Sequence, residues 1–479
     1  MTARTGALGE HAREEGLDIG FVSMGFPPDV GGIETHLGAL ARELSGRGHR
    51  VHVLCLDTRA DRAPYTSADD VVEGVRVRRV AYRWHDHRSL ADFSARAAAN
   101  DVVMAWLAEE PCDVVHVHHA SGFGAGLLQA VSDMGRPLCV TLHDYWFLCP
   151  RGQMFRRDGV VCERAEPVAC GVCLAATWPQ LLPSGRGDVL AADAAAAATR
   201  TAHALEMLAL PARLFAPSKA AREVFERAGV PAQRIDVVEN GIDASELARD
   251  VAALRATSGE SSSVVRIGVL GSAQPSKGVL EFARAALALE ERELVVEIHG
   301  ALADYHGDQA TVEALRELAA RDARLVLRGA FAHADLAAVL ARLDAVAVPS
   351  LWNETFGLTA REARAAGLRV LASDRGGLRE LRDDPGVRLL PSHDPRAWTD
   401  AVAALLGERR VALERGEKPM PARLRTVHEL ALELETHYVD LVRTQLGREP
   451  ALVFEAGTDR RAQRTAAPAP SWWRRLRGG

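Results

Sequence analysis

The sequence predicts an α/β protein made of two doubly wound halves, each with a parallel sheet covered by helices on both faces. Short continuous apolar runs recur along the 479 residues, and helical segments rich in alanine separate them. A polar run at 258–263 interrupts this alternation, which then restarts. Strands buried on both faces read as continuous apolar runs. The ligand of such a protein is expected at the carboxyl ends of the strands, in the crevice between the halves.

The first half begins with a strand, a glycine turn and a helix. An apolar stretch starts at Asp18 and stops at two prolines, Gly31 and Gly32 form the turn, and residues 33–47 have a helical pattern that Gly48 ends. Further strands of this half are predicted at residues 51–56, 75–80, 114–117, 138–142 and 214–216.

The second half repeats the alternation. Its strands are predicted at residues 264–271, 294–299, 324–327, 345–348 and 369–372. One amphipathic helix follows at 423–446, and the low-complexity composition beyond it predicts a disordered tail over 448–479. We therefore expect an N-terminal domain at 17–257, with a cysteine-rich insertion at 149–173, and a C-terminal domain at 258–420.

Composition and charge exclude several classes of protein. Lys and Arg number 58 against 64 Asp and Glu, a net charge of −6, which argues against a nucleic-acid-binding protein because such a protein needs a concentrated basic face. The sequence contains no run of about 18 consecutive apolar residues, the length needed to span a bilayer. Neither a secretory signal nor a disulfide framework is apparent, so we expect a cytoplasmic protein with reduced thiols.

The stretch from Pro349 to Gly367 carries the strongest functional signal. It follows an apolar strand and opens a helix, with Glu354 just before the helix and Glu362 within it. The amides of residues 356–358 (Phe356, Gly357 and Leu358) are then among the unpaired N–H groups at the helix start, which suit a phosphate. Glu362 could reach a hydroxylated part of the same ligand. The alternative is that both glutamates are solvated helix carboxylates.

A lysine in another loop points to the same ligand. Lys277 lies in a βα loop after the strand at 264–271, and the chain has only two other lysines. A lysine there is a compact positive charge that can meet a diphosphate. The alternative is an ordinary surface lysine.

These motifs, in this order, resemble the retaining family 4 glycosyltransferases with the GT-B fold. The C-terminal half shares Glu-x7-Glu with an upstream Lys-Gly and a downstream Gly-Gly-x-x-Glu. The N-terminal half shares PPDVGGIETH, DVVHVHH, VTLHDYWFLCP, APSKAAREVFERAGV and VVENGID. The resemblance covers residues 17–446 and implies an N-terminal acceptor-side domain, a C-terminal nucleotide-sugar-binding domain and a helix at 421–447 that returns to the N-terminal domain.

The resemblance also implies roles for the C-terminal residues. Lys277 would neutralise the diphosphate of the donor, Glu362 would bind the ribose hydroxyls, and Glu354 would contact the transferred sugar. The amides of residues 356–358 would hold the phosphate.

On the N-terminal side, Gly31 and Gly32 would let their loop close over the same phosphates, and His143 would hydrogen-bond the sugar. Without the family, His143 is equally well explained as a core histidine. The family often carries an arginine where this chain has Ser272, so the donor site lacks one expected cation. Another arginine, such as Arg375, could replace it.

The resemblance implies transfer with retention of the anomeric configuration, to a glycan, lipid-linked or small-molecule acceptor. No Asp-x-Asp pair occurs in the sequence, so we expect no catalytic metal and predict that Lys277 and the helix start meet the charge of the leaving group. Two alternatives stay open, a sugar-nucleotide epimerase of the same fold and a catalytically silent nucleotide-sugar-binding protein.

Two further features lie outside the donor motifs. Cys149, Cys162, Cys170 and Cys173 are spaced as C-x12-C-x7-C-x2-C and could form a closed structural zinc site, or be buried thiols. The tail residues Trp472, Trp473, Arg474, Arg475 and Arg477 could contact an anionic membrane surface, or be unstructured.

Overall fold

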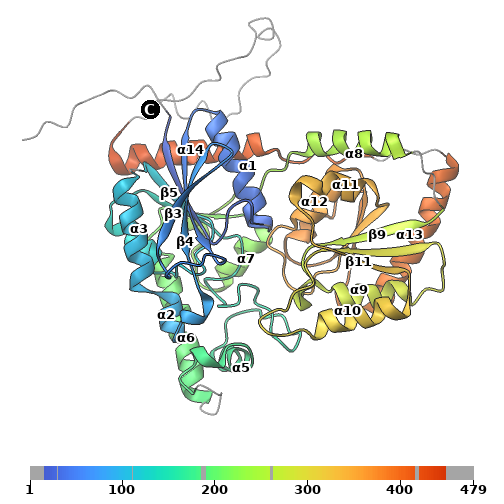
Figure 1. The fold of residues 1–479 in the computed structure, drawn as a ribbon, viewed down its shortest axis with the longest axis horizontal. Coiled ribbons are helices and arrows are strands. Elements are labelled where there is room, and N and C mark those ends of the chain that lie inside the picture. Colours follow the sequence, from blue (N-terminus) through green and yellow to red (C-terminus); the bar gives the residue numbers. More distant parts are fainter. Residues whose placement is uncertain are drawn as a thin grey trace, which may run out of the picture.

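The computed structural model has two lobes, each built on a twisted sheet with helices on both faces (Figure 1). It describes residues 16–29, 31–110, 112–184, 190–258, 263–415 and 420–448. The predicted tail, with its tryptophans and arginines, lies outside these residues from 449 onward. The prediction of two doubly wound α/β halves is confirmed.

The sheet of the first lobe has eight strands. They are β1 (Asp18–Ser23), β2 (Arg50–Asp57), β3 (Ser67–Val72), β4 (Val75–Ala81), β5 (Val114–Val117), β6 (Leu138–Thr141), β7 (Arg213–Ala216) and β8 (Ile235–Val237). Their spatial order is β3-β4-β2-β1-β5-β6-β7-β8. Every residue of β1, β5 and β6 is buried, which explains why these strands are apolar throughout.

The sequence predicted a purely parallel first sheet, and this prediction is wrong for one edge strand. β3 pairs antiparallel with β4 across a tight turn in which Glu73 and Gly74 have φ values of 50° and 84°. Positive φ at both turn residues is the hairpin geometry that matches strand twist. β3 escaped prediction because it is a mostly exposed edge strand with polar residues such as Asp69 and Asp70.

The sheet of the second lobe has six strands, each parallel to its neighbours. They are β9 (Val265–Leu270), β10 (Leu294–His299), β11 (Leu325–Gly329), β12 (Ala345–Val348), β13 (Arg369–Ser373) and β14 (Val387–Leu390). Their order is β11-β10-β9-β12-β13-β14. The strand order reverses between β9 and β12, and ligands of open α/β sheets bind at such a point.

Helices cover both sheets. Those before the second sheet are α1 (Gly32–Gly46), α2 (Leu90–Ser94), α3 (Ala97–Glu109), α4 (Leu127–Asp133), α5 (Pro167–Thr177), α6 (Leu190–Met207), α7 (Lys219–Arg227) and α8 (Ala244–Ser258). Those after its first strand are α9 (Val279–Leu287), α10 (Ala310–Arg321), α11 (Leu336–Ala341), α12 (Leu358–Ala365), α13 (Pro395–Arg415) and α14 (Val427–Leu446).

Helix α8 belongs by its contacts to the second lobe, although the predicted domain boundary placed it in the first. Val251 of α8 is buried in one apolar cluster with residues of α11 and α12. Arg255 donates a 2.6 Å hydrogen bond to the carbonyl of Leu343. The lobes therefore divide near residue 243, before α8, rather than at 257.

The last helix lies along the first lobe (Figure 1). It begins at Val427, four residues later than predicted, because Thr426 and Glu429 form a capping box that fixes the helix start. Glu435 of α14 accepts a 2.5 Å hydrogen bond from Arg47, which follows α1. Tyr438 lies 2.7 Å from Nδ1 of His116 in β5.

The two segments that connect the lobes lie side by side. The amide of Ile242, on the outgoing segment, donates a 2.9 Å hydrogen bond to the carbonyl of Arg425 on the returning one. A Cβ on Gly241 would lie 2.4 Å from the carbonyl oxygen of Thr426, so a residue without a side chain is needed for this close approach.

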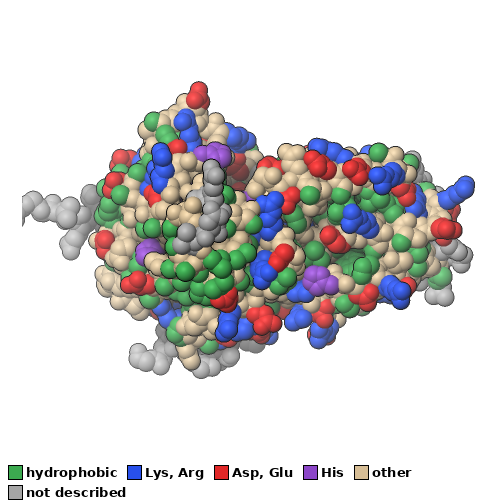
Figure 2. Space-filling model, turned by 90° about the horizontal axis from the view of Figure 1, so that it is seen from below, with side chains coloured by type: hydrophobic (Ala, Val, Ile, Leu, Met, Phe, Trp, Pro, Cys, Tyr) green, Lys and Arg blue, Asp and Glu red, His purple; other side chains and the backbone are tan. Residues whose placement is uncertain are grey.

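Within the described residues, no helix is long and apolar enough to cross a membrane. Figure 2 views the molecule from the side on which α5 and α6 lie, and apolar side chains gather on the first lobe there. Val168 and Val172 of α5 are about half exposed.

Candidate active site between the lobes

The loops after β9 and β12 meet at the carboxyl edge of the second sheet, where the site was expected. Nζ of Lys277 lies 2.7 Å from Oε1 of Glu354, and the hydroxyl of Ser350 donates a 2.6 Å hydrogen bond to the same oxygen. Glu354 is 6% exposed. Burial alone would raise its pKa, but the charge of Lys277 and these hydrogen bonds outweigh burial and lower it. The carboxylate is therefore ionised and paired.

Gly278 fixes the position of Lys277. Its φ of 64° is left-handed, and a Cβ there would lie 2.1 Å from the carbonyl oxygen of Pro349. The amide of Leu351 also donates a 2.7 Å hydrogen bond to the carbonyl of Ser276. The loop after β9 is thus held against the loop after β12, which places the lysine opposite the glutamate.

Glu362 is a buried carboxylate without a counterion. It lies on α12 and is 8% exposed, and among the residues that the structure describes no side chain pairs with its carboxylate. Burial raises its pKa to about 7. A buried acid that lacks a partner is a candidate for ligand binding.

The start of α12 presents free amides to the crevice. Gly357 precedes the helix with φ of 80°, and within the described part of the chain the amides of Phe356, Gly357 and Leu358 donate no hydrogen bond. Gly32, the first residue of α1, faces this point, since a Cβ on it would lie 4.0 Å from Cδ2 of Leu358. Two helix starts, each with a partial positive charge, therefore approach one another.

The glycine turn before α1 is tightly packed. A Cβ on Gly31 would lie 2.1 Å from Oε2 of Glu34. The carboxylate of Glu34, at the end of a flexible side chain, therefore lies against this turn, which is next to the first residue of α12.

His143 approaches the second lobe from the end of β6. Its carbonyl accepts a 2.7 Å hydrogen bond from the hydroxyl of Thr355, and the hydroxyl of Ser218 in turn donates to the carbonyl of Thr355 at 2.5 Å. Burial lowers the pKa of His143 well below the usual value, so the ring is neutral. It can donate or accept a hydrogen bond but supplies no charge.

His143 belongs to a group of buried histidines. Its ligand nitrogen and those of His36 and His118 lie within 4.8 Å of one another, a geometry that could hold a metal ion. Nδ1 of His118 lies 3.0 Å from Nε2 of His143. This contact satisfies one nitrogen of each ring without a metal.

Ser272 lies in the loop after β9 and brings no charge. Nε of Arg375, the suggested substitute, donates instead to the hydroxyl of Ser392 at 2.5 Å. A buried arginine that the sequence did not single out lies closer to the helix start. Arg361 of α12 packs over the ring of Phe356, 3.8 Å from its centroid, and donates to the carbonyl of Phe356.

The four clustered cysteines lie in the insertion between β6 and α6, and each is partly buried. Across the described ranges, no three of their sulfur atoms lie within 4.8 Å of one another. Sulfur ligands on one zinc ion stand roughly 3.8 Å apart, given a Zn–S bond of about 2.3 Å. The zinc site stays a prediction, and zinc binding would require the four thiols to draw closer.

A cavity of about 760 Å³ adjoins this site in the crevice between the lobes. Trp352, which follows β12 and lines the cavity, also lies under Nζ of Lys277, 5.3 Å from it. Most of the aromatic residues that line it were not predicted, because they come from separate segments of both lobes. They are Tyr82, Trp84, Phe93, Trp146, Trp178, Tyr305 and Trp352.

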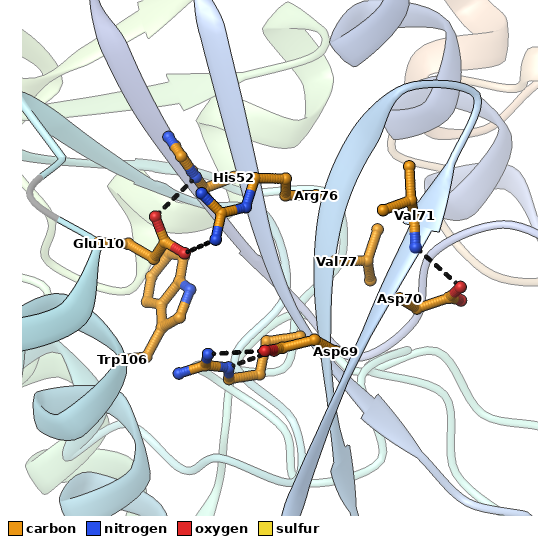
Figure 3. Close-up of a pocket in the computed structure, with 9 residues that line it drawn as sticks. His52, Asp69, Asp70, Val71, Arg76, Val77, Trp106 and Glu110 are labelled. Carbon is orange, nitrogen blue, oxygen red and sulfur yellow. Dashed lines mark hydrogen bonds and ion pairs between the residues drawn. The ribbon is translucent and has the colours of Figure 1, made fainter.

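A second cavity, of about 490 Å³, lies at the outer edge of the first sheet (Figure 3). Its charged groups already pair with one another, Arg76 with Glu110 at 2.8 Å and Arg78 with Asp69 at 2.7 Å. It therefore offers few free polar groups to a ligand.

Two family models match this chain. Residues 30–246 match a family model described as Glycosyltransferase Family 4, and residues 264–408 match one described as Glycosyl transferases group 1. A D-inositol 3-phosphate glycosyltransferase from Xylanimonas cellulosilytica is 29% identical over 408 residues, which are 81% of this chain and 87% of the relative. One from Nocardia farcinica is 36% identical over 197 residues, 40% of this chain and 43% of the relative.

Two solved structures share the fold. The structure of Anabaena HepE in complex with UDP and glucose superposes with a TM-score of 0.56 at 19% identity, covering 90% of this chain and 98% of that one. Sucrose-phosphate synthase from Thermosynechococcus elongatus superposes with a TM-score of 0.60 at 17% identity, covering 90% and 97%.

Proposed function

The chain belongs to family 4 of the GT-B glycosyltransferases, since two family models together match most of it, and we propose that it transfers a sugar from a nucleotide-diphosphate sugar. In this reaction the bond between C1 of the sugar and the diphosphate oxygen breaks, and a bond between C1 and an acceptor oxygen forms. The hydroxyl proton of the acceptor leaves with the nucleoside diphosphate.

One observation carries the proposal: Lys277 pairs with Glu354, just before the start of α12, and the start of α1 lies against the start of α12. A lysine and two helix starts together attract a diphosphate and stabilise its charge as it departs. In the proposed complex Lys277 binds the diphosphate, while the amides of Phe356, Gly357 and Leu358 hold its distal phosphate.

The two glutamates take different roles because their surroundings differ. Glu362 has no cation paired with it among the described residues and binds the ribose hydroxyls, whose O–H groups supply the missing donors. Glu354, ionised beside Lys277, lies where the transferred sugar meets the diphosphate. His143, a neutral ring on the opposite lobe, hydrogen-bonds that sugar.

We further propose that transfer retains the anomeric configuration and needs no metal. Lys277 and the helix starts already supply positive charge at the leaving group, and the sequence has no Asp-x-Asp pair. Acceptor and leaving group would occupy the same face of the sugar, and the departing phosphate would take the acceptor proton.

The test is a donor panel. UDP-, GDP- and ADP-sugars are screened by thermal shift, since a bound donor raises the melting temperature, and then by release of nucleoside diphosphate with and without EDTA. HepE in complex with UDP and glucose supports trying UDP-sugars first. NMR of the product reports its anomeric configuration.

Each contrary result has a definite meaning. A changed sugar still attached to the nucleotide, formed without acceptor, would identify an epimerase. A protein that binds no nucleotide sugar, or that binds one and never turns it over, would refute the proposed transfer. Loss of activity in EDTA would refute metal independence alone.

A further inference from the structure

We infer that the acceptor is an uncharged sugar held against aromatic rings, and that phosphorylated acceptors are poor substrates. The inference rests on the proposed function, because it assigns the 760 Å³ cavity as the acceptor site. It also separates this chain from relatives named for D-inositol 3-phosphate.

The position of the cavity makes it the acceptor site. Its lining comes from loops after β1, β4, β5 and β6 of the first lobe and after β9, β10 and β12 of the second. Trp352 forms part of its wall, and Nζ of Lys277 lies 5.3 Å from the centroid of the same ring. A molecule in the cavity therefore lies next to the point where the diphosphate would leave.

The aromatic walls suit the apolar face of a sugar ring. Trp84 and Trp178 lie with ring centroids 4.6 Å apart, and Phe93 meets Trp146 edge-on at 5.6 Å. Trp178 also meets His306 of the second lobe at 4.8 Å, so both lobes contribute. The C–H face of a pyranose is apolar and weakly positive, and it packs on the negative face of an aromatic ring.

The polar groups of the cavity suit hydroxyls. Nε2 of Gln153 donates to Gln274 across the lobes at 2.9 Å, which leaves Oε1 of Gln153 buried without a partner among the described residues. Asp144 lies 2.8 Å from Nε2 of His119. Amide and carboxylate oxygens such as these accept hydrogen bonds from sugar hydroxyls.

The charges of the cavity oppose a phosphate. Among the described residues that line it, Arg151 is the one Lys or Arg, and the carboxylates of Asp144 and Asp304 line the same cavity. Arg151 is 9% exposed, and its Nη1 already donates to the carbonyl of Phe155 at 2.8 Å and to Sγ of Cys173 at 3.3 Å. Its buried Nε has no partner among the described residues, so a phosphomonoester would meet one partly committed arginine together with two carboxylates of like charge.

The experiment compares four acceptors with the donor that the panel identifies: octyl glucoside, octyl mannoside, glucose 6-phosphate and D-inositol 3-phosphate. We expect kcat/KM for the better neutral glycoside to exceed that for either phosphate at least about 10-fold, a difference of ~1.4 kcal/mol. Equal or better use of a phosphate would overturn the inference. Donor binding by thermal shift is measured separately, so failure of the proposed function is recognised on its own.

Two variants sharpen the test. Trp84→Ala is expected to raise KM for the neutral acceptor about 10-fold with a smaller change in kcat, as loss of stacking would, and Trp84→Phe is expected to restore most of the affinity. Asp304→Lys is expected to improve use of the phosphates relative to the glycosides. Unchanged acceptor KM in Trp84→Ala, or unchanged preference in Asp304→Lys, would contradict the assignment.

Discussion

The ammonium of Lys277 lies 2.7 Å from the buried carboxylate of Glu354, 77 residues further along the chain. The contact joins the loops after β9 and β12, two strands that pair directly, so it depends on that pairing. It also means that the cation proposed to meet the diphosphate is held, before donor binds, by the group proposed to meet the sugar. Donor binding must therefore redistribute an existing ion pair.

Replacing Lys277 should affect turnover and stability in different ways. Lys277→Ala should lower kcat by roughly 10²–10³-fold, the usual loss when a preorganised electrostatic group is removed. It should also lower the melting temperature, because Glu354 would stay buried without its cation. In the double variant with Glu354→Gln, melting should recover while turnover does not.

The matched control for this prediction is Lys219→Ala, since Lys219 is exposed at the start of α7. It should keep the turnover and the melting temperature of the unmodified protein. Near-normal turnover in Lys277→Ala would contradict the role of the lysine.

Glu362 should make the donor-free protein less stable at alkaline pH. Its pKa is about 7 in the folded protein, above the usual value of roughly 4.3, so its contribution to stability is full below the usual value and is lost as pH rises through 7. Glu362→Gln should therefore stabilise the protein by ~1–3 kcal/mol at pH 8 and by much less at pH 5. Urea unfolding at the two pH values measures this.

The same variant should bind donor at least about 10-fold more weakly, because an amide accepts hydrogen bonds less strongly than a carboxylate. Glu362→Gln should therefore weaken donor binding while it raises the stability of the donor-free protein. An unchanged free energy of unfolding at both pH values would show that Glu362 is not the buried, unpaired acid described above.

Gly278 should be essential for the loop that carries Lys277. Gly278→Ala forces a side chain to within 2.1 Å of the carbonyl oxygen of Pro349, so the loop must move and turnover should fall at least about 10-fold. Gly135→Ala is a matched control, because Gly135 has the same φ of 64° but open space around it. It should cost only ~1–2 kcal/mol of backbone strain. Equal turnover in the two variants would disprove the packing argument.

The cysteine insertion should bind about one zinc ion. Burial raises the pKa of Cys162 to about 11 and that of Cys170 to about 12, so the metal-free thiols are protonated and zinc binding should release protons. Elemental analysis of protein purified without chelators, before and after changing Cys149, Cys162, Cys170 and Cys173 to serine, measures the stoichiometry. Cys112→Ala, at a buried thiol outside the insertion, is the control. Less than about a tenth of an equivalent of zinc would end this prediction.

The positions of Lys277, Glu354 and Glu362 in the fold could be predicted from the sequence, because these residues follow apolar strands at short distances along the chain. Lys277 and Glu354 come from loops after strands whose limits were predicted to within two residues, and Glu362 lies two turns into the helix that follows. The cavity between the lobes could not be predicted, because Trp84, Trp178 and Tyr305 come from loops that no periodicity relates. Only the folded chain shows that they share one wall.

The missed elements have similar causes. β3 is polar because it lies at an exposed edge, so it lacks the apolar run of the inner strands. The lobe to which α8 belongs depends on contacts of Val251 with residues about 90–110 positions later. Arg361 and Arg364 are buried, although arginine is usually exposed. Backbone carbonyls and Asp384 pair with their guanidinium groups, and only the tertiary structure brings Asp384 near.

The paired crossing of the chain, where Ile242 bonds Arg425, limits how the enzyme can open. Two connecting segments at distant edges would let the lobes twist or slide against each other. Two connecting segments that are hydrogen-bonded side by side act instead as a single hinge. Because Gly241 and Thr426 are in close contact, the two segments of this hinge have little room to move relative to each other. Opening and closing should therefore be a rotation of one lobe about a single hinge axis. Each opening would move Lys277 away from His143 in the same direction.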